Sequence, residues 1–322
     1  MGRSAESGLA AALATIVEGC LGIRPGESLL VLADPPSREL GEAMRDRGQE
    51  AGADAVLALM AERPTHGAEP PPPVAAALLA ADAFLAPTTK SLSHTAARKA
   101  ATEQGVRGAT LPGVTEDMLA RVMAVDFDAL RARSQLVAAR LDAAGEARLT
   151  CPRGSDMRLD LRGRSGIADD GDLTTPGAFG NLPCGEGFIA PAGGEGTVVA
   201  SSLAAVGLAT ARLVVEGGRL RRVEDGGEAG ERFLALLTEH GDAGTNLAEL
   251  GVGTNDRATL TGEVLEDEKI LGTVHVAFGA SAAIGGTVSV PVHLDCVVLD
   301  ATLELDGGAA QPILAGGELV LE

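Results

Sequence analysis

A histidine and an aspartate stand two positions apart in an extended apolar segment late in the chain. The segment runs from Val292 to Asp295, and its polar members are His293 and Asp295. On a β-strand, residues i and i+2 project to the same face, about 6.6 Å apart along the chain. An imidazole and a carboxylate on one face are typical of half a metal site, and a buried His–Asp hydrogen bond is the alternative interpretation.

Three further residues could complete such a site. His275 lies in a second strand-like apolar run, where an inward polar side chain needs a partner. Glu186 and Glu249 stand in apolar or glycine-rich segments. Each acid taken alone could instead cap a helix or lie in a solvated loop. Together with the His-Asp pair, these residues favour a metal site.

Other chemically capable residues have plainer interpretations. The run Glu266–Lys269 is typical of a solvated turn, with Glu268 as an alternative outer acid near the site. His94 follows the carboxyl end of an expected strand, where open α/β sheets present ligand-contacting groups. We expect either an exposed His94 beside a helix-capping Ser93, or a His94 that serves as a proton shuttle or substrate contact.

The four cysteines lie far apart, without the two-residue spacing of zinc ribbons or redox motifs. This pattern predicts neither a structural zinc nor a disulfide framework. We expect the cysteines to behave as small buried hydrophobic residues of a protein in a reducing compartment. A nucleophilic role for Cys184 is the alternative, because this residue neighbours Glu186.

Composition excludes several classes of protein. The 322 residues include 26 Lys+Arg and 45 Asp+Glu, a formal net charge of −19, with 45% apolar residues, no Trp and no Tyr. Nucleic-acid binding needs clustered cations and stacking aromatic residues, so it is excluded. No apolar run reaches the ~20 residues of a membrane span, and no signal peptide is evident. We therefore expect a globular cytoplasmic protein without membrane contact.

The residues up to about 144 alternate helical and strand patterns, which predicts an α/β, Rossmann-like domain with a parallel sheet. No Gly-x-Gly-x-x-Gly follows any of the expected strands, so the dinucleotide fingerprint is absent. The expected strands are Leu29–Ala33, Ala55–Leu59, Ala83–Ala86 and Val106–Leu111.

From residue 145 to 322 the pattern predicts a β-rich α+β domain that carries the metal site. A long helix over residues 126–144 would connect the two domains. Gly217-Gly218 between two apolar runs predicts a hairpin. Pro291 indicates that the strand over residues 288–299 begins late or lies at an edge.

Four segments resemble the aminopeptidase T family of leucyl metallo-aminopeptidases. The resemblance implies two divalent ions, zinc, cobalt or manganese, held by Glu186, Glu249, His275, His293 and Asp295, with Asp295 as the bridging carboxylate. It further implies that a hydroxide bridging the ions hydrolyses the N-terminal bond of a small peptide or related amino-acid-derived amide, in a homodimer. The segments are Asn181–Pro191, Ala248–Asn255, Glu266–Gly279 and Val292–Cys296.

Two alternative functions stay open. A branch of the family, the dihydroxypyridine dioxygenases, uses one non-haem iron held by two histidines and an aspartate. This chain retains the acids and the histidine of the peptidase pattern, which favours the hydrolase. It also departs from the peptidases, because Ala282 stands where they have a catalytic tyrosine. A metal-free binding protein is the remaining alternative.

Overall fold

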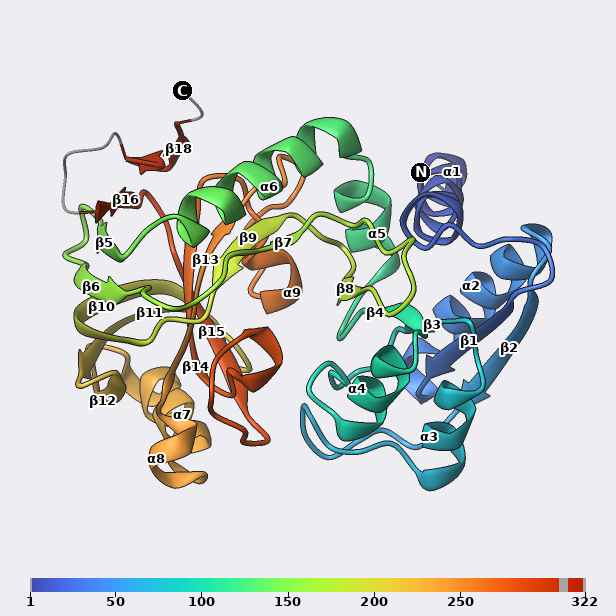
Figure 1. The fold of residues 1–322 in the computed structure, drawn as a ribbon, viewed down its shortest axis with the longest axis horizontal. Helices are drawn as coiled ribbons and strands as arrows, with labels where there is room; N and C mark the ends of the chain where they lie inside the picture. The colour runs from blue at the N-terminus through green and yellow to red at the C-terminus, as the bar shows by residue number, and fades with distance from the viewer. Residues whose placement is uncertain (1, 307–311, 321–322) are drawn as a thin grey trace. The chain divides into compact units, whose positions relative to one another are not determined.

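The structure is a computed structural model that describes residues 2–306 and 312–320. It has two compact units. Unit 1 comprises residues 1–125 and 171–184, and unit 2 comprises residues 126–170 and 185–322. Unit 1 has a parallel α/β sheet and unit 2 a curled antiparallel sheet, so the predicted fold class is confirmed (Figure 1).

Unit 1 contains a five-stranded sheet in the order β2-β1-β3-β4-β8, with every pair parallel. The first four strands lie in the expected segments. β1, β3 and β4 are buried along nearly their whole length, whereas β2 at the edge is partly exposed. The fifth, β8, comes from a segment beyond residue 145 and was not predicted. The strands are β1 (Ser28–Ala33), β2 (Asp54–Leu59), β3 (Ala83–Ala86), β4 (Arg107–Thr110) and β8 (Phe179–Asn181).

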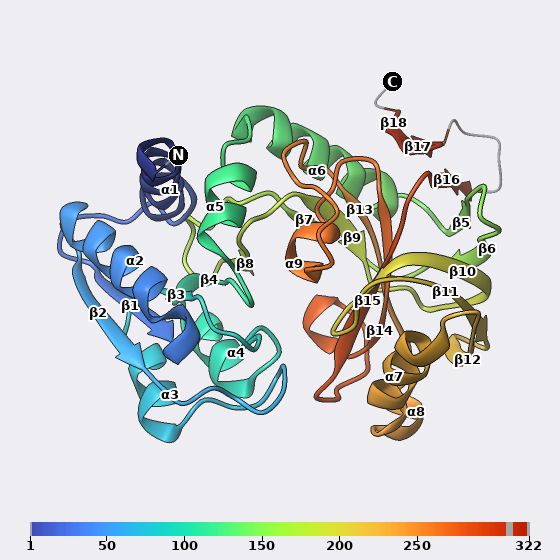
Figure 2. The same cartoon turned by 180° about the vertical axis from the view of Figure 1, so that it is seen from behind.

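Helices cover both faces of this sheet (Figure 2). Alternate β1 side chains face opposite layers: Val31 lies near Gly41 of α2, whereas Leu30 and Leu32 share a buried cluster with Leu78 of α3. The helical elements of unit 1 are α1 (Gly2–Ala14), η1 (Thr15–Cys20), η2 (Pro35–Ser37), α2 (Arg38–Glu50), α3 (Pro72–Leu79), α4 (Ala96–Glu103) and α5 (Glu116–Val122).

Unit 2 is built on a long sheet whose centre is the antiparallel series β9-β13-β14-β15. The predicted hairpin at Gly217-Gly218 is present between β11 and β12. The strands are β5 (Glu146–Thr150), β6 (Asp156–Asp160), β7 (Ile167–Asp169), β9 (Glu186–Ile189), β10 (Gly193–Leu203), β11 (Gly207–Glu216), β12 (Arg219–Glu224), β13 (Leu247–Gly253), β14 (Val274–Gly279), β15 (His293–Val298), β16 (Thr302–Leu305), β17 (Leu314–Ala315) and β18 (Glu318–Leu319).

The longest helix of unit 2, α6, packs directly on strands β7 and β9. Glycine permits this close approach, because a Cβ at Gly187 of β9 would lie 2.7 Å from the Val137 side chain. The helical elements of unit 2 are α6 (Phe127–Asp142), α7 (Gly227–Thr238), α8 (Gly241–Gly244), α9 (Val264–Asp267) and η3 (Ala282–Ile284).

The unit limits differ from the predicted division into residues 1–144 and 145–322. The helix expected to connect the domains belongs to unit 2, because its apolar face packs on β9. Residues 171–184 return to unit 1 and supply β8. Within the described residues, no helix combines the length and apolar character needed to cross a membrane.

Candidate metal centre

Three neighbouring strands of unit 2 separate polar from apolar side chains by the two-residue period of a β-strand. In the register, Glu249 of β13, Ala277 of β14 and Asp295 of β15 lie side by side. Gly251 lies opposite His275 in the next row. Small residues between the ligands therefore leave room for them on one face. The other face packs into the core through Leu250, Val252, Val274, Val276, Phe278, Leu294, Cys296 and Val298.

The five predicted ligand residues form two groups that share one carboxylate. Site A comprises Glu186, Glu249 and His275, and site B comprises Glu249, His293 and Asp295. In each group, one ligand atom per residue lies within 4.8 Å of the others. All five residues are buried or nearly so. The strands thus bring together ligands that are up to 109 positions apart in the sequence.

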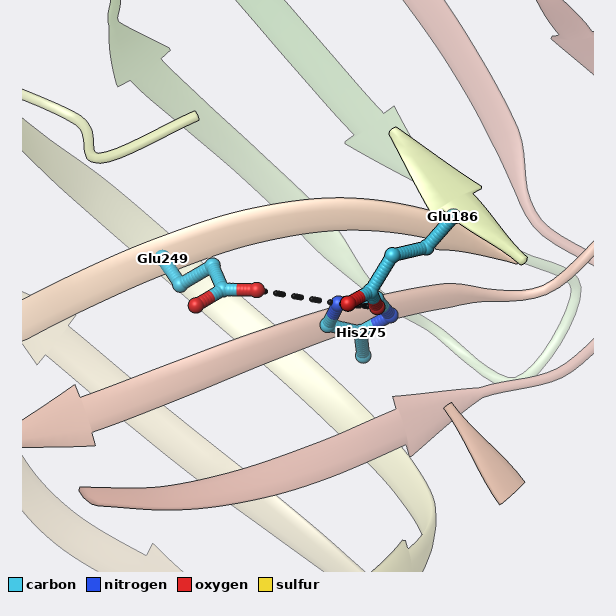
Figure 3. A group of neighbouring side chains, drawn as sticks. All are labelled: Glu186, Glu249 and His275. Atoms are coloured by element: carbon cyan, nitrogen blue, oxygen red, sulfur yellow. Dashed lines mark hydrogen bonds and ion pairs between the residues drawn. The ribbon is translucent and has the colours of Figure 1, made fainter. Parts of the chain in front are cut away.

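The shared residue offers a different oxygen to each site. Glu249 Oε1 lies 3.2 Å from His275 Nε2, and Glu249 Oε2 lies 3.3 Å from His293 Nε2. In site A, Glu186 Oε2 also approaches His275 Nε2, at 3.1 Å. Figure 3 shows the two glutamates of site A converging on the imidazole. Glu249 is therefore the residue that belongs to both groups, and the expectation that Asp295 bridges two ions stays a prediction.

The orientation of His293 suits a metal ligand. Its Nδ1 lies 2.7 Å from the carbonyl oxygen of Ala280, which can only accept a hydrogen bond. Nδ1 therefore carries the proton, and Nε2 faces Glu249 and Asp295, at 3.3 and 3.7 Å. Metal-binding histidines are commonly oriented by such a hydrogen bond from the second ring nitrogen.

Surrounding carboxylates control the charge of both histidines. Burial disfavours an imidazolium, but hydrogen bonds to Glu186 and Glu249 and their negative charges outweigh it and raise the pKa of His275 well above its usual value. Burial likewise opposes the charged form of His293, and Asp295 and Glu249 raise its pKa well above the ordinary range. Without a metal ion, both imidazole rings therefore favour the protonated form, whose positive charge lies where a bound cation would lie.

The charge run after β13 is buried, contrary to the prediction of a solvated turn. Lys269 is fully buried, and its Nζ lies 2.6 Å from Glu186 Oε1 and 2.8 Å from Glu268 Oε1. Burial raises the pKa of Glu268 to about 8; the charge of Lys269 opposes this rise, and those of Asp295 and Glu186 add to it. Glu268 therefore does lie beside the site, as the alternative interpretation proposed.

The two other acids of this run anchor the loop before it. Asp267 accepts hydrogen bonds from Thr261, Gly262 and the Ser202 hydroxyl. Glu266 accepts from the backbone and hydroxyl of Thr259. Both acids are buried because their hydrogen bonds replace water, and they fix the segment that carries Lys269.

The buried donors fit a metal ion chemically. Glu186 Oε2 is buried and lies 3.1 Å from His275 Nε2, so without a cation it depends on that imidazole for a partner. Several carboxylates share this interior, and burial of unpaired negative charge is costly. A divalent cation would satisfy both needs, and mixed oxygen and imidazole ligands suit zinc, cobalt, manganese or iron.

Three further candidate residues do not belong to the two ligand groups. His94 is half-buried in a turn of unit 1, and Thr95 rather than Ser93 caps the following helix, α4. Its role as a proton shuttle or substrate contact stays a prediction. Cys184 is buried in unit 1. Cys296 lies on the core side of β15, where burial raises the pKa of its thiol, so it is no nucleophile.

Sequence reasoning missed Lys269 and Gly251. Lys269 contacts Glu186, which lies 83 positions away, so nothing in the local run indicates its burial. Gly251 leaves the space that His275 fills, because a Cβ there would lie 2.0 Å from His275 Nε2. Its place in a glycine-rich segment beside Glu249 is the signal that could have revealed it.

The paired ligand groups, buried in the antiparallel sheet of unit 2, define a candidate metal centre. A family model described as NicX, 2,5-dihydroxypyridine 5,6-dioxygenase, matches residues 17–321. The chain therefore belongs to the NicX family. No curated protein sequence matches it significantly.

Two solved structures share the fold. The 2,5-dihydroxypyridine dioxygenase of Pseudomonas putida KT2440 has a TM-score of 0.82 at 18% identity, covering 97% of this chain and 96% of that one. Wild-type AmpT of Thermus thermophilus has a TM-score of 0.72 at 18% identity, covering 98% and 99%. The resemblance to aminopeptidase T is thus confirmed for the fold, whereas the matching family model names a dioxygenase.

Proposed function

We propose that this chain is a metal-dependent hydrolase whose centre takes two divalent ions, one in site A and one in site B. The observation that carries this proposal is the position of Glu249, which directs one oxygen toward each histidine. Two ions of this kind, when bound, activate a water molecule and polarise the carbonyl that it attacks. The substrate class that the aminopeptidase resemblance suggests is a small peptide or related amide with a free amino terminus.

The side chains of the chain perform the positioning in this proposal. The carbonyl of Ala280 holds the His293 ring with Nε2 toward site B. Lys269 holds Glu186 through one oxygen. Glu268 has its pKa raised to about 8 by burial, so it holds a proton near neutral pH and could exchange it with a bound substrate.

A second candidate function is ring cleavage of a dihydroxypyridine by a mononuclear iron enzyme. The family match over residues 17–321 favours it, because the family model carries that activity in its description. Site B would hold the iron. Its donors are one imidazole and two carboxylates, whereas non-haem iron oxygenases typically use two histidines and one carboxylate. The description of the matching family thus favours the oxygenase, and the set of ligand residues favours the hydrolase.

One reconstitution experiment separates these functions. The metal-stripped protein is loaded with Zn²⁺, Co²⁺, Mn²⁺ or, without air, Fe²⁺. Hydrolysis of aminoacyl p-nitroanilides and oxygen uptake with 2,5-dihydroxypyridine are then measured on each form. Two ions per chain and hydrolysis support the proposal. Oxygen uptake by a form with one iron, without hydrolysis by any form, would establish the second candidate instead.

A further inference from the structure

Lys269 is a fully buried charged residue at the edge of the metal centre, and neither candidate reaction requires its charge. Its ammonium contacts Glu186 Oε1 at 2.6 Å and Glu268 Oε1 at 2.8 Å, and lies 3.6 Å from Asp169 Oδ2. A fully buried lysine is rare unless it is paired. Its three acidic neighbours come from β7, β9 and the segment after α9, so Lys269 joins three separate parts of unit 2 at the edge of site A.

Hydrogen bonds hold the backbone of Lys269. The amide of Asn255 donates to the carbonyl of Lys269, and the amide of Lys269 donates to that of Glu266. A Cβ at Gly253 would lie 2.8 Å from the carbonyl carbon of Lys269, so β13 packs tightly against this point. The backbone that carries this side chain is therefore held in place, and the ammonium lies among Glu186, Glu268 and Asp169.

Lys269 makes the two sites unequal. In site B, Glu249, His293 and Asp295 pair with one another. In site A, Glu186 gives one of its two oxygens to Lys269 and directs only Oε2 toward His275. A cation in site A would also lie close to the charge of Lys269, which is fully buried, and like charges at close range repel strongly away from water.

We propose that Lys269 is a positioning residue that reserves one oxygen of Glu186 and thereby makes site A the weaker of two metal sites. Site B fills first, and site A fills only at higher metal concentration. This inference rests on the proposed two-ion function and specifies the order in which the centre is loaded. It assigns to Lys269 no contact with the substrate.

Calorimetric titration of the metal-stripped full chain with Zn²⁺ tests this order. We expect two binding steps in the wild type. Lys269→Met removes the charge but keeps an unbranched apolar side chain, and we expect it to tighten the weaker step about tenfold or more. Lys99→Met removes an exposed lysine of α4, whose side chain is 64% accessible, and serves as the matched control with unchanged binding.

Asp169→Asn distinguishes this role from a merely structural one. It retains Lys269 but removes the carboxylate that lies 3.6 Å from its ammonium, so it should weaken the same step that Lys269→Met tightens. A role limited to packing predicts that both variants weaken binding. If Lys269→Met does not fold, the double variant Lys269→Met/Asp169→Asn replaces the pair without a net change of charge, and its weaker step should be tighter than that of Asp169→Asn.

The outcomes separate this inference from the proposed function. Two steps in the wild type that Lys269→Met leaves unchanged or weakens would overturn the inference and retain the two-ion centre. One ion in the wild type and two in Lys269→Met would support the role of Lys269 and overturn the two-ion function. One ion in both proteins would overturn both.

Discussion

Strands β1 and β3 of unit 1 and strands β13 to β15 of unit 2 are buried to a similar degree, but the side chains that they carry differ. Strands β1 and β3 are buried along nearly their whole length and carry only apolar side chains between Leu29 and Ala33 and between Ala83 and Ala86. Strands β13 to β15 are equally buried, yet they carry four of the five candidate ligands.

This difference shows that burial alone does not distinguish a core from a reactive centre. In β1 and β3 each side chain between these limits contributes apolar area, and its neighbours can adjust when it is changed. In unit 2 each ligand depends on one or two specific partners, so a single change leaves a buried charge unpaired. Substitutions in the two regions should therefore fail in different ways.

Removal of the shared carboxylate should have the largest effect on the metal centre. Glu249→Gln takes a charge from both sites, so we expect loss of both ions and of activity, although the side chain keeps its shape. Asp295→Asn affects site B alone and should retain an ion in site A. Elemental analysis of both proteins tests this contrast, and Glu249→Gln protein that still holds two ions would refute the bridging position.

A methyl group at Gly251 should have the next largest effect. The added Cβ would overlap His275, so the imidazole must turn away from Glu186 and Glu249. Disturbing the support of a metal ligand commonly lowers affinity on the order of 10- to 100-fold. Gly193→Ala is the matched control, because its Cβ meets nothing within 4 Å. Equal zinc affinity of the two variants would contradict this role.

Metal affinity should increase with pH. The pKa values of His275 and His293 are raised without metal, so both rings are protonated through the neutral range and each must lose a proton to bind an ion. Affinity should therefore fall by about tenfold per pH unit for each displaced proton as the pH is lowered. Zinc titrations at several pH values measure the slope, and affinity independent of pH would exclude protonated apo histidines.

Truncation of a core side chain in unit 1 should have the smallest effect on the metal centre. The Phe84 ring fills the space above Gly108, where a Cβ would lie 2.4 Å from it. Phe84→Ala should reduce the free energy of unfolding by about 3–5 kcal/mol, measured by urea denaturation. Metal bound per folded chain should not change. A loss of metal at temperatures where the protein stays folded would show that the two regions are coupled.

The sequence predicted those elements whose signal is local. Apolar runs located the first four strands of unit 1, and Pro291 indicated the late start of β15, which begins at His293. The i, i+2 spacing placed His293 and Asp295 on one face, and their side chains approach to 3.7 Å. These inferences needed only the period of a strand and the missing amide of proline.

Features that depend on distant partners could not be predicted in this way. Strand β8 has three residues, too few for a periodic pattern, and it exists because β4 offers an edge. Strands β9 and β13, which carry Glu186 and Glu249, were not predicted, because both acids stand in glycine-rich segments and glycine weakens a strand pattern. The buried run at Lys269 resembles a solvated turn, because its acidic partners are brought by other strands.

The path of the backbone between the units has a consequence for synthesis. The chain leaves unit 1 after residue 125, returns at 171 to add β8, and leaves again after 184. A nascent chain therefore cannot complete its first sheet until the start of unit 2 has already emerged from the ribosome. A fragment that stops at residue 144 would lack β8 and leave β4 as an open edge, which could pair with another chain.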